Sequence, residues 1–317
     1  MIVGLAILLM IQFGLIAICN LTLIYQNLDC DNAKMFRHII EIWRNKTLFI
    51  ENWSYMTTLE IDCGSLFAIL FYGLTNNIYM AYGISNIIFT AMFIATVFYL
   101  FKGENLLYPL LCVNLICIPY RLGMLDYFNM MFFAGTQYVV KVMIPLLLVG
   151  IILDVERQQN EKRKTSKITL AMSIIYVFLL FLTCMSSSVY VMACGILPIC
   201  IGYAGYKFFS CEKVSKKFIL LLIISVFCLV VGNYINIKVM GGTRGNSMIF
   251  CSVYELLANI SSAFFGMFEL FGATTTSFEL QIFTLEGILI VAKIFVVILI
   301  LTCGFISIFK LVNGKWE

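Results

Sequence analysis

Long apolar segments recur along the whole chain, and their length most constrains what it can fold into. Seven stretches can each supply the roughly 20 apolar residues that a helix needs to cross a bilayer. They lie at 2–25, 78–101, 133–153, 168–185, 190–208, 218–237 and 285–309, with a shorter candidate at 105–119. In the hydrocarbon core of a bilayer, a backbone N–H or C=O group without a hydrogen-bond partner is costly. A helix pairs these groups within itself, whereas an open sheet or an irregular segment does not. The sequence therefore predicts an all-α polytopic membrane protein of about eight transmembrane helices, with further juxtamembrane helices.

Composition supports this class and excludes others. The chain is 62% hydrophobic and 12% charged, whereas a soluble domain carries about 25% charged residues. We expect a single transmembrane domain over 1–317 with no soluble domain and no nucleic-acid partner. The first stretch lacks a basic n-region and a small-residue cleavage site, so we interpret it as an uncleaved span. The twelve cysteines are interpreted as small hydrophobes; a disulfide between Cys30 and Cys63 is left open.

Lysine and arginine cluster in three short segments, at 157–167, 207–217 and 310–315. The positive-inside rule assigns these segments and both termini to the cytoplasm, with 26–61, 120–132 and 239–284 outside. We expect the membrane to be a bacterial cell membrane. Segment 62–77 has too few apolar residues for a crossing. A crossing there would also place every later loop on the opposite side of the membrane relative to the N-terminus. We therefore predict that 62–77 is a half-inserted helix.

The two large outer loops are predicted to carry juxtamembrane helices. In the first loop, 26–61, residues 31–45 have the pattern of an in-plane amphipathic helix. The expected apolar side holds Met35, Ile39, Ile42 and Trp43, and the expected polar side holds Lys34, Arg37, His38, Glu41 and Arg44. The second loop, 239–284, is apolar in its middle and has room for one or two such helices.

The first outer loop opens with two acidic residues, Asp29 and Asp31, on either side of Cys30. Carboxylates with this spacing can converge on one hard cation such as Mg²⁺ or Mn²⁺, or one can act as a base beside its ionised neighbour. A structural role is the alternative, because Asp31 precedes the predicted helix and aspartate is a favoured N-cap. The pair is a candidate catalytic and metal site.

Other ionisable residues fall in the outer loops or inside a span. The candidate substrate-binding residues are His38, Glu60, Asp62, Arg121, Lys141 and Arg244. Asp126, close to Arg121 in sequence, is the third candidate catalytic carboxylate. Guanidinium binds phosphate through two hydrogen bonds, and a lysine inside a span is a functional candidate by default. The alternatives are an interfacial ion pair of Arg121 with Asp126, a snorkelling Lys141, and a hydrogen-bonded interfacial His38.

This arrangement resembles the GT-C superfamily of integral membrane glycosyltransferases. In that superfamily a first span leads into an outer loop with an acidic motif, matched here by Asp29 and Asp31. A second acidic residue follows in a later outer loop, matched by Asp126, and another large outer loop follows the seventh span, matched by 239–284. The stretch from Trp53 to Asp62 is similar to the entry into the superfamily's juxtamembrane region, although the common Pro-Pro sequence is absent.

The resemblance implies an enzyme that transfers a sugar from a polyprenyl-phosphate carrier to an acceptor at the outer face, usually with inversion. It implies Asp31 as the catalytic base, with Asp29 and Asp126 supporting it or binding a divalent cation. It implies Arg121 and Arg244 as ligands of the lipid phosphate. The expected partners are the lipid-linked donor and membrane lipids; the oligomeric state is left open. A transporter or flippase and a non-catalytic scaffold of an envelope complex are the competing functions.

Overall fold

The computed structural model describes residues 1–27, 30–53, 55, 58–59, 61, 63–119, 128–133, 135–161, 166–187, 189–240, 252–273 and 283–312. All regular structure within these ranges is helical, without a strand. Seven of the described helices are long and apolar enough to cross a membrane. The prediction of an all-α polytopic membrane protein is confirmed.

The seven long segments of the sequence correspond to seven long helical segments. The elements are α1 (Ile2–Thr22), η1 (Ile24–Asn27), α2 (Cys30–Asn45), α3 (Cys63–Thr75), α4 (Ile78–Leu100), α5 (Leu107–Ile116), η2 (Asn129–Phe133), α6 (Gly135–Asn160), α7 (Lys167–Ser187), η3 (Met192–Ile196), α8 (Leu197–Phe209), α9 (Lys216–Met240), α10 (Val253–Leu270) and α11 (Leu285–Val312). The 3₁₀-helix is η1, and η2 and η3 are π-helices. The eighth expected span, 105–119, contains α5, whose 10 residues are about half of a crossing.

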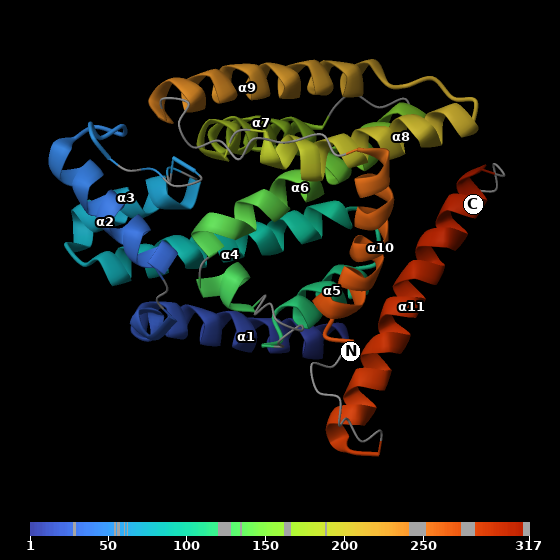
Figure 1. Ribbon diagram of the computed structural model, residues 1–317, viewed down its shortest axis with the longest axis horizontal. Helices are drawn as coiled ribbons and strands as arrows, with labels where there is room; N and C mark the ends of the chain where they lie inside the picture. The colour runs from blue at the N-terminus through green and yellow to red at the C-terminus, as the bar shows by residue number, and fades with distance from the viewer. Residues whose placement is uncertain are drawn as a thin grey trace. The chain divides into compact units, whose positions relative to one another are not determined.

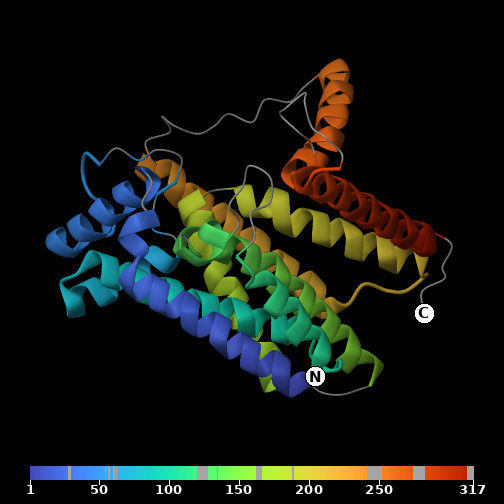
Figure 2. The ribbon, with the colours of Figure 1, turned by 90° about the horizontal axis from the view of Figure 1, so that it is seen from below.

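The chain divides into two compact units. The first comprises 1–118, 128–204 and 214–245, and the second comprises 119–127, 205–213 and 246–317. In the first unit α4 and α6 lie side by side at the centre, with α1 and α5 against α4 and with α7 and then α9 beyond α6 (Figures 1 and 2). The core between them is fully buried and includes Tyr82, Phe89, Met143, Leu147 and Tyr176.

Three elements meet near the C-terminus of α1. A Cβ at Gly83 of α4 would lie 2.2 Å from the backbone oxygen of Asn20 in α1, so glycine is required for this close approach. The side chain of Asn20 donates a hydrogen bond to the carbonyl of Phe132 in η2 at 2.9 Å, and Asn86 of α4 donates to Asn20 Oδ1 at 2.8 Å. The end of α1, the start of α4 and the π-helix before α6 therefore share one end of the first unit.

The same end holds the C-termini of α7 and α9. These two helices run parallel, because Tyr176 contacts Ser225 near the middle of both and Asn236 donates to the carbonyl of Ser186 near their ends. At the opposite end α4 and α6 finish and α7 begins, where Lys102 and Thr169 both reach Asp154. The long helices therefore connect two defined ends of one bundle.

Helices α2 and α3 cover the end at which α1 finishes, and we call it the α2 end (Figures 1 and 2). The Trp43 ring of α2 fills the space over Gly73 of α3, where a Cβ would lie 2.3 Å from it. Phe36 packs edge-on against Tyr79 and Tyr82 of α4, with ring centroids 5.7 and 4.7 Å apart. The chain between α1 and α4 thus leaves and re-enters the bundle at one end. The predicted half-insertion of 62–77 concerns depth in the membrane and stays a prediction.

In the second unit α10 and α11 contact each other. Helix α10 begins with a capping box: the Ser252 hydroxyl accepts from the Glu255 backbone N–H, and the Glu255 carboxylate accepts from the Ser252 backbone N–H. No side chain of α10 is buried. Helix α11 is the last of the seven long apolar helices.

Candidate functional site

Helix α2 is amphipathic, but His38 does not lie on its polar side. The inward side buries Met35, Ile39 and Ile42 as expected, and Arg37 is exposed. His38, however, is 0% exposed, so its predicted position among the exposed polar residues is wrong. The physical reason is that the chain after α2 folds back over this side and supplies aromatic partners for the imidazole.

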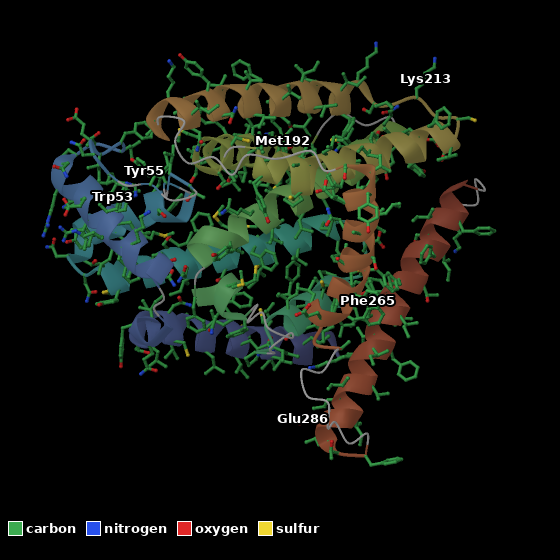
Figure 3. The ribbon with its side chains drawn as sticks, viewed as in Figure 1. Trp53, Tyr55, Met192, Lys213, Phe265 and Glu286 are labelled. Carbon is green, nitrogen blue, oxygen red and sulfur yellow. The ribbon has the colours of Figure 1, made fainter. Side chains whose placement is uncertain are left out.

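Two aromatic residues from the returning segment enclose His38. The Trp53 indole stacks on the imidazole, with ring centroids 4.8 Å apart and 25° between the planes. Tyr55 meets the same imidazole edge-on at 5.6 Å. Figure 3 shows Trp53 and Tyr55 on the segment beside α2. Aromatic pairs with these geometries stabilise by about 0.5–1.5 kcal/mol beyond their area burial. His38 therefore joins α2 to the loop after it.

The first turns of α2 are attached to α4 by a buried polar contact. The hydroxyl of Tyr82 donates a hydrogen bond to Asn32 Oδ1 at 3.0 Å, and the two residues are 0% and 4% exposed. Phe36, one turn further along α2, packs on the same tyrosine ring. Asp31 is the neighbour of Asn32 in the first turn of α2, which begins at Cys30. The position of Asp31 along the bundle is thus set by contacts between α2 and α4.

The side chain of Asp31 and six further candidate residues lie outside the described part of the structure: Asp29, Glu60, Asp62, Arg121, Asp126 and Arg244. The side chains of Cys30 and Cys63 lie outside it as well. The residues on either side of Glu60 are described, and they show where the chain lies at this point. Leu59 and Ile61 are both 0% exposed, and the Leu59 N–H donates to the carbonyl of Ser186 at 3.0 Å. Leu59 is therefore held against the end of α7.

The elements that border Asp29 and Asp126 contact each other: η1 precedes Asp29, η2 follows Asp126, and η1 packs on η2 and α4. Two carbonyls of the π-helix η2 accept hydrogen bonds from asparagine side chains of two spans. Asn20 donates to Phe132 O, and Asn86 donates to Phe133 O at 2.7 Å. π-Helices in proteins occur frequently at functional sites. No group of three or more potential metal ligands is found in the described part of the chain.

Lys141 lies in the second turn of α6, which starts at Gly135. Its side chain is half-buried, and Nζ lies 5.6 Å from the centroid of the Tyr138 ring. A cation over an aromatic face within about 6 Å is attracted by the ring quadrupole. The structure thus gives this lysine an aromatic partner on its own helix.

A buried polar cluster at the opposite end of the bundle was missed by the sequence analysis. Asp154, in the last turns of α6, is 4% exposed. Its Oδ2 accepts from Lys102 Nζ at 2.7 Å, from Thr169 Oγ1 at 2.6 Å and from Tyr99 Oη at 3.4 Å. Gln158 donates to Thr169 Oγ1 at 2.6 Å. The available signal was a carboxylate directly after the last apolar residue of the predicted 133–153 span.

This cluster lies at the end of the bundle opposite α2, so it is separate from the candidate site. It links α6 to α4, to the turn after α4 and to α7 through the contacts of Asp154 with Tyr99, Lys102 and Thr169. We interpret it as a structural connection. Comparison with protein-family models, with curated proteins and with solved structures finds no match for the chain.

Proposed function

We propose that the protein is a membrane glycosyltransferase of the GT-C type. It transfers a sugar from a polyprenyl-phosphate carrier to a cell-envelope acceptor, and the reaction takes place at the α2 end. One observation carries the proposal: the chain leaves the bundle after α1 and re-enters it at α4 at a single end, where α2 and α3 form a helical layer and Asp31 lies in the first turn of α2. A lipid-linked substrate needs a polar site of this kind beside the membrane surface.

The sidedness of the bundle agrees with an outer site. The short connections at the end opposite α2 carry basic residues: Lys102 follows α4, Arg157 lies in the last turn of α6, and Lys167 and Lys216 begin α7 and α9. The basic residues of the α2 end lie mostly on the amphipathic helix α2 and directly after it rather than in a short connection. By the positive-inside rule this end faces the cytoplasm. The α2 end then faces outside, which is where lipid-linked sugar donors of this type are used.

The chemistry assigns roles to the acidic motif. The acceptor hydroxyl loses its proton as it attacks the sugar, so a carboxylate within hydrogen-bonding reach serves as general base, and we assign this role to Asp31. Negative charge near the oxocarbenium-like transition state stabilises it, and this is the role of Asp29 and Asp126. A divalent cation, if bound, is held by Asp29 and Asp31. The departing lipid phosphate is stabilised by cations, for which we propose Arg121 and Arg244.

The remaining candidates contribute to binding. His38 is enclosed by Trp53 and Tyr55, so it acts by holding the loop that carries Glu60 and Asp62 rather than by touching the substrate directly. We assign to Lys141, near the start of α6, the binding of the anionic part of the donor. Each of these roles depends on the α2 end being the site of transfer.

The proposal is tested first in cells and then with purified protein. Lipid-linked sugars are extracted from cells with and without the gene, and the proposal predicts that a polyprenyl-phosphate sugar accumulates in its absence. The purified protein in detergent should transfer sugar from that donor. Unchanged lipid-linked sugar pools, together with no transfer by purified protein, would overturn the proposed function.

A transporter is the second candidate function; in that case the buried pairing of Asp154 with Lys102, which is a structural connection in a transferase, would belong to the ion path. Charged residues inside a membrane bundle are characteristic of ion-coupled transporters. In that case proton- or ion-coupled uptake into vesicles should be lost on Lys141→Met or Asp154→Asn. A transferase would instead retain partial activity in Lys141→Met and show no coupled uptake.

A further inference from the structure

We infer that Tyr82 is a positioning residue for the acidic motif, acting through Asn32. The inference rests on the proposed function, since it concerns the residue to which the base role is assigned. Tyr82 lies in the second turn of α4, and Asn32 follows Asp31 directly in α2. The hydrogen bond between them is 3.0 Å long and lies between two buried side chains.

The geometry makes this contact specific. Gly83, the next residue of α4, is pressed against the backbone of Asn20, so α4 is fixed to α1 at this level. Phe36 packs edge-on against the Tyr82 ring at 4.7 Å. The ring of Tyr82 therefore orients α2 by packing, and its hydroxyl sets the register of the first turn. A buried hydrogen bond has a preferred distance and direction, so it constrains the neighbouring residue of the chain more narrowly than non-directional apolar packing does.

Loss of the hydroxyl should therefore act on catalysis more than on folding. In Tyr82→Phe the ring and its contact with Phe36 are kept, and α2 remains on α4. Without the hydrogen bond, the first turn of α2 should shift by a fraction of an ångström. Misplacement of a catalytic group by about 1 Å can cost about 100-fold in rate. We expect kcat to fall about tenfold or more and KM to change little.

The chain offers a matched control. Tyr176 is also 0% exposed, and its hydroxyl makes a 2.8 Å hydrogen bond with Ser225 between α7 and α9. Tyr176→Phe removes a buried tyrosine hydroxyl of the same kind away from α2. A merely structural role for Tyr82 predicts that the two variants behave alike in both thermal stability and turnover. A positioning role predicts similar stability, with kcat lowered only in Tyr82→Phe.

A double-mutant cycle and a labelling assay complete the test. Asn32→Leu combined with Tyr82→Phe should lower kcat no further than the more damaging single change, because each single change already breaks the hydrogen bond between the two side chains. Independently of any transfer activity, alkylation of Asp31→Cys by a maleimide, quantified at that residue by mass spectrometry, should accelerate several-fold on adding Tyr82→Phe and be unaffected by Tyr176→Phe.

The outcomes separate the two proposals. Normal kcat in Tyr82→Phe, in a preparation whose wild type transfers sugar, would overturn the positioning role and leave the function standing. Absence of transfer by wild type, together with unchanged lipid-linked sugar pools in cells without the gene, would overturn the function, and the labelling rates would still decide whether Tyr82 fixes the first turn of α2. Equal labelling rates in both tyrosine backgrounds would overturn the inference.

Discussion

Removing the lysine that neutralises the buried carboxylate of Asp154 should destabilise the first unit. Asp154 is 4% exposed, and Lys102 Nζ lies 2.7 Å from its Oδ2. In Lys102→Met the aliphatic stem is largely kept while the charge is lost. The carboxylate then remains buried with hydrogen bonds from Thr169 and Tyr99 but without a cation.

The expected loss in the free energy of unfolding follows from how far Lys102 and Asp154 are buried. Breaking a fully buried ion pair by removing one partner costs about 3–5 kcal/mol, whereas surface pairs contribute about 0–1 kcal/mol. The side chain of Lys102 is 33% exposed and that of Asp154 is 5% exposed, so water replaces part of the lost interaction. We expect a loss of about 2 kcal/mol, which lies between these limits and corresponds to roughly a 30-fold change in the folded-to-unfolded ratio.

Unfolding in detergent by increasing SDS mole fraction measures this loss. The double variant Lys102→Met with Asp154→Asn removes the orphaned charge, so it should be more stable than Lys102→Met alone. Glu104→Gln is the control: Glu104 lies 3.6 Å from Arg157, and both side chains are partly exposed, so the change should be within about 0.5 kcal/mol. A double variant whose destabilisation equals the sum of the single losses would refute the coupling between the two residues.

Three further predictions follow from other parts of the chain. Asn86→Leu should cost about 2–3 kcal/mol in the same SDS titration, because it removes bonds to Asn20 and to the η2 carbonyl of Phe133 and leaves buried acceptors unpaired; a loss below about 0.5 kcal/mol would contradict this. Cysteines at Glu51 and Asn77 should both react with an impermeant maleimide from outside if 62–77 is half-inserted; protection of Asn77 alone would mean that the segment crosses. Hydrogen bonds from the Ser252 backbone and hydroxyl hold the pKa of Glu255 below its usual value, so the ionised carboxylate stabilises the start of α10 above the ordinary glutamate pKa. That stabilisation should disappear as the pH falls through the lower folded pKa, seen as faster amide exchange at 253–256 after correction for intrinsic rates; a Glu255→Gln protein with the same pH dependence would contradict it.

The spans were predictable because apolar length is a local property of the sequence. Residues 78–101 correspond to α4 almost residue for residue, and 2–25 correspond to α1 followed by η1. Breaks within the hydrophobic pattern were less visible. The π-helix at 129–133 lies at the start of the predicted span 133–153, where the sequence pattern suggested only a continuous α-helix. Two of its carbonyls accept hydrogen bonds from asparagines of α1 and α4.

Side-chain burial at the candidate site depends on contacts between distant segments. His38 has the helical position of a polar residue, and it is buried because Trp53 and Tyr55 fold back over it. The pairing of Lys102 with Asp154 joins the turn after α4 to α6, and helical periodicity within one segment gives no sign of it. The acidic motif was recognisable as a motif, while its partners in space are set by tertiary packing.

The measurement that tests the central claim most directly is sugar transfer from a polyprenyl-phosphate donor by the purified Asp31→Asn protein. Asparagine keeps the size of the side chain and cannot accept the acceptor's proton, so turnover should fall about 10²–10⁴-fold without loss of folding. Glu51→Gln, an exposed acidic residue of the same loop, should leave turnover unchanged. Asp29→Asn should be milder, unless a divalent cation bridges the pair, in which case both losses are similar and chelator-sensitive. Near-normal turnover in Asp31→Asn would contradict the assignment of this residue as the catalytic base.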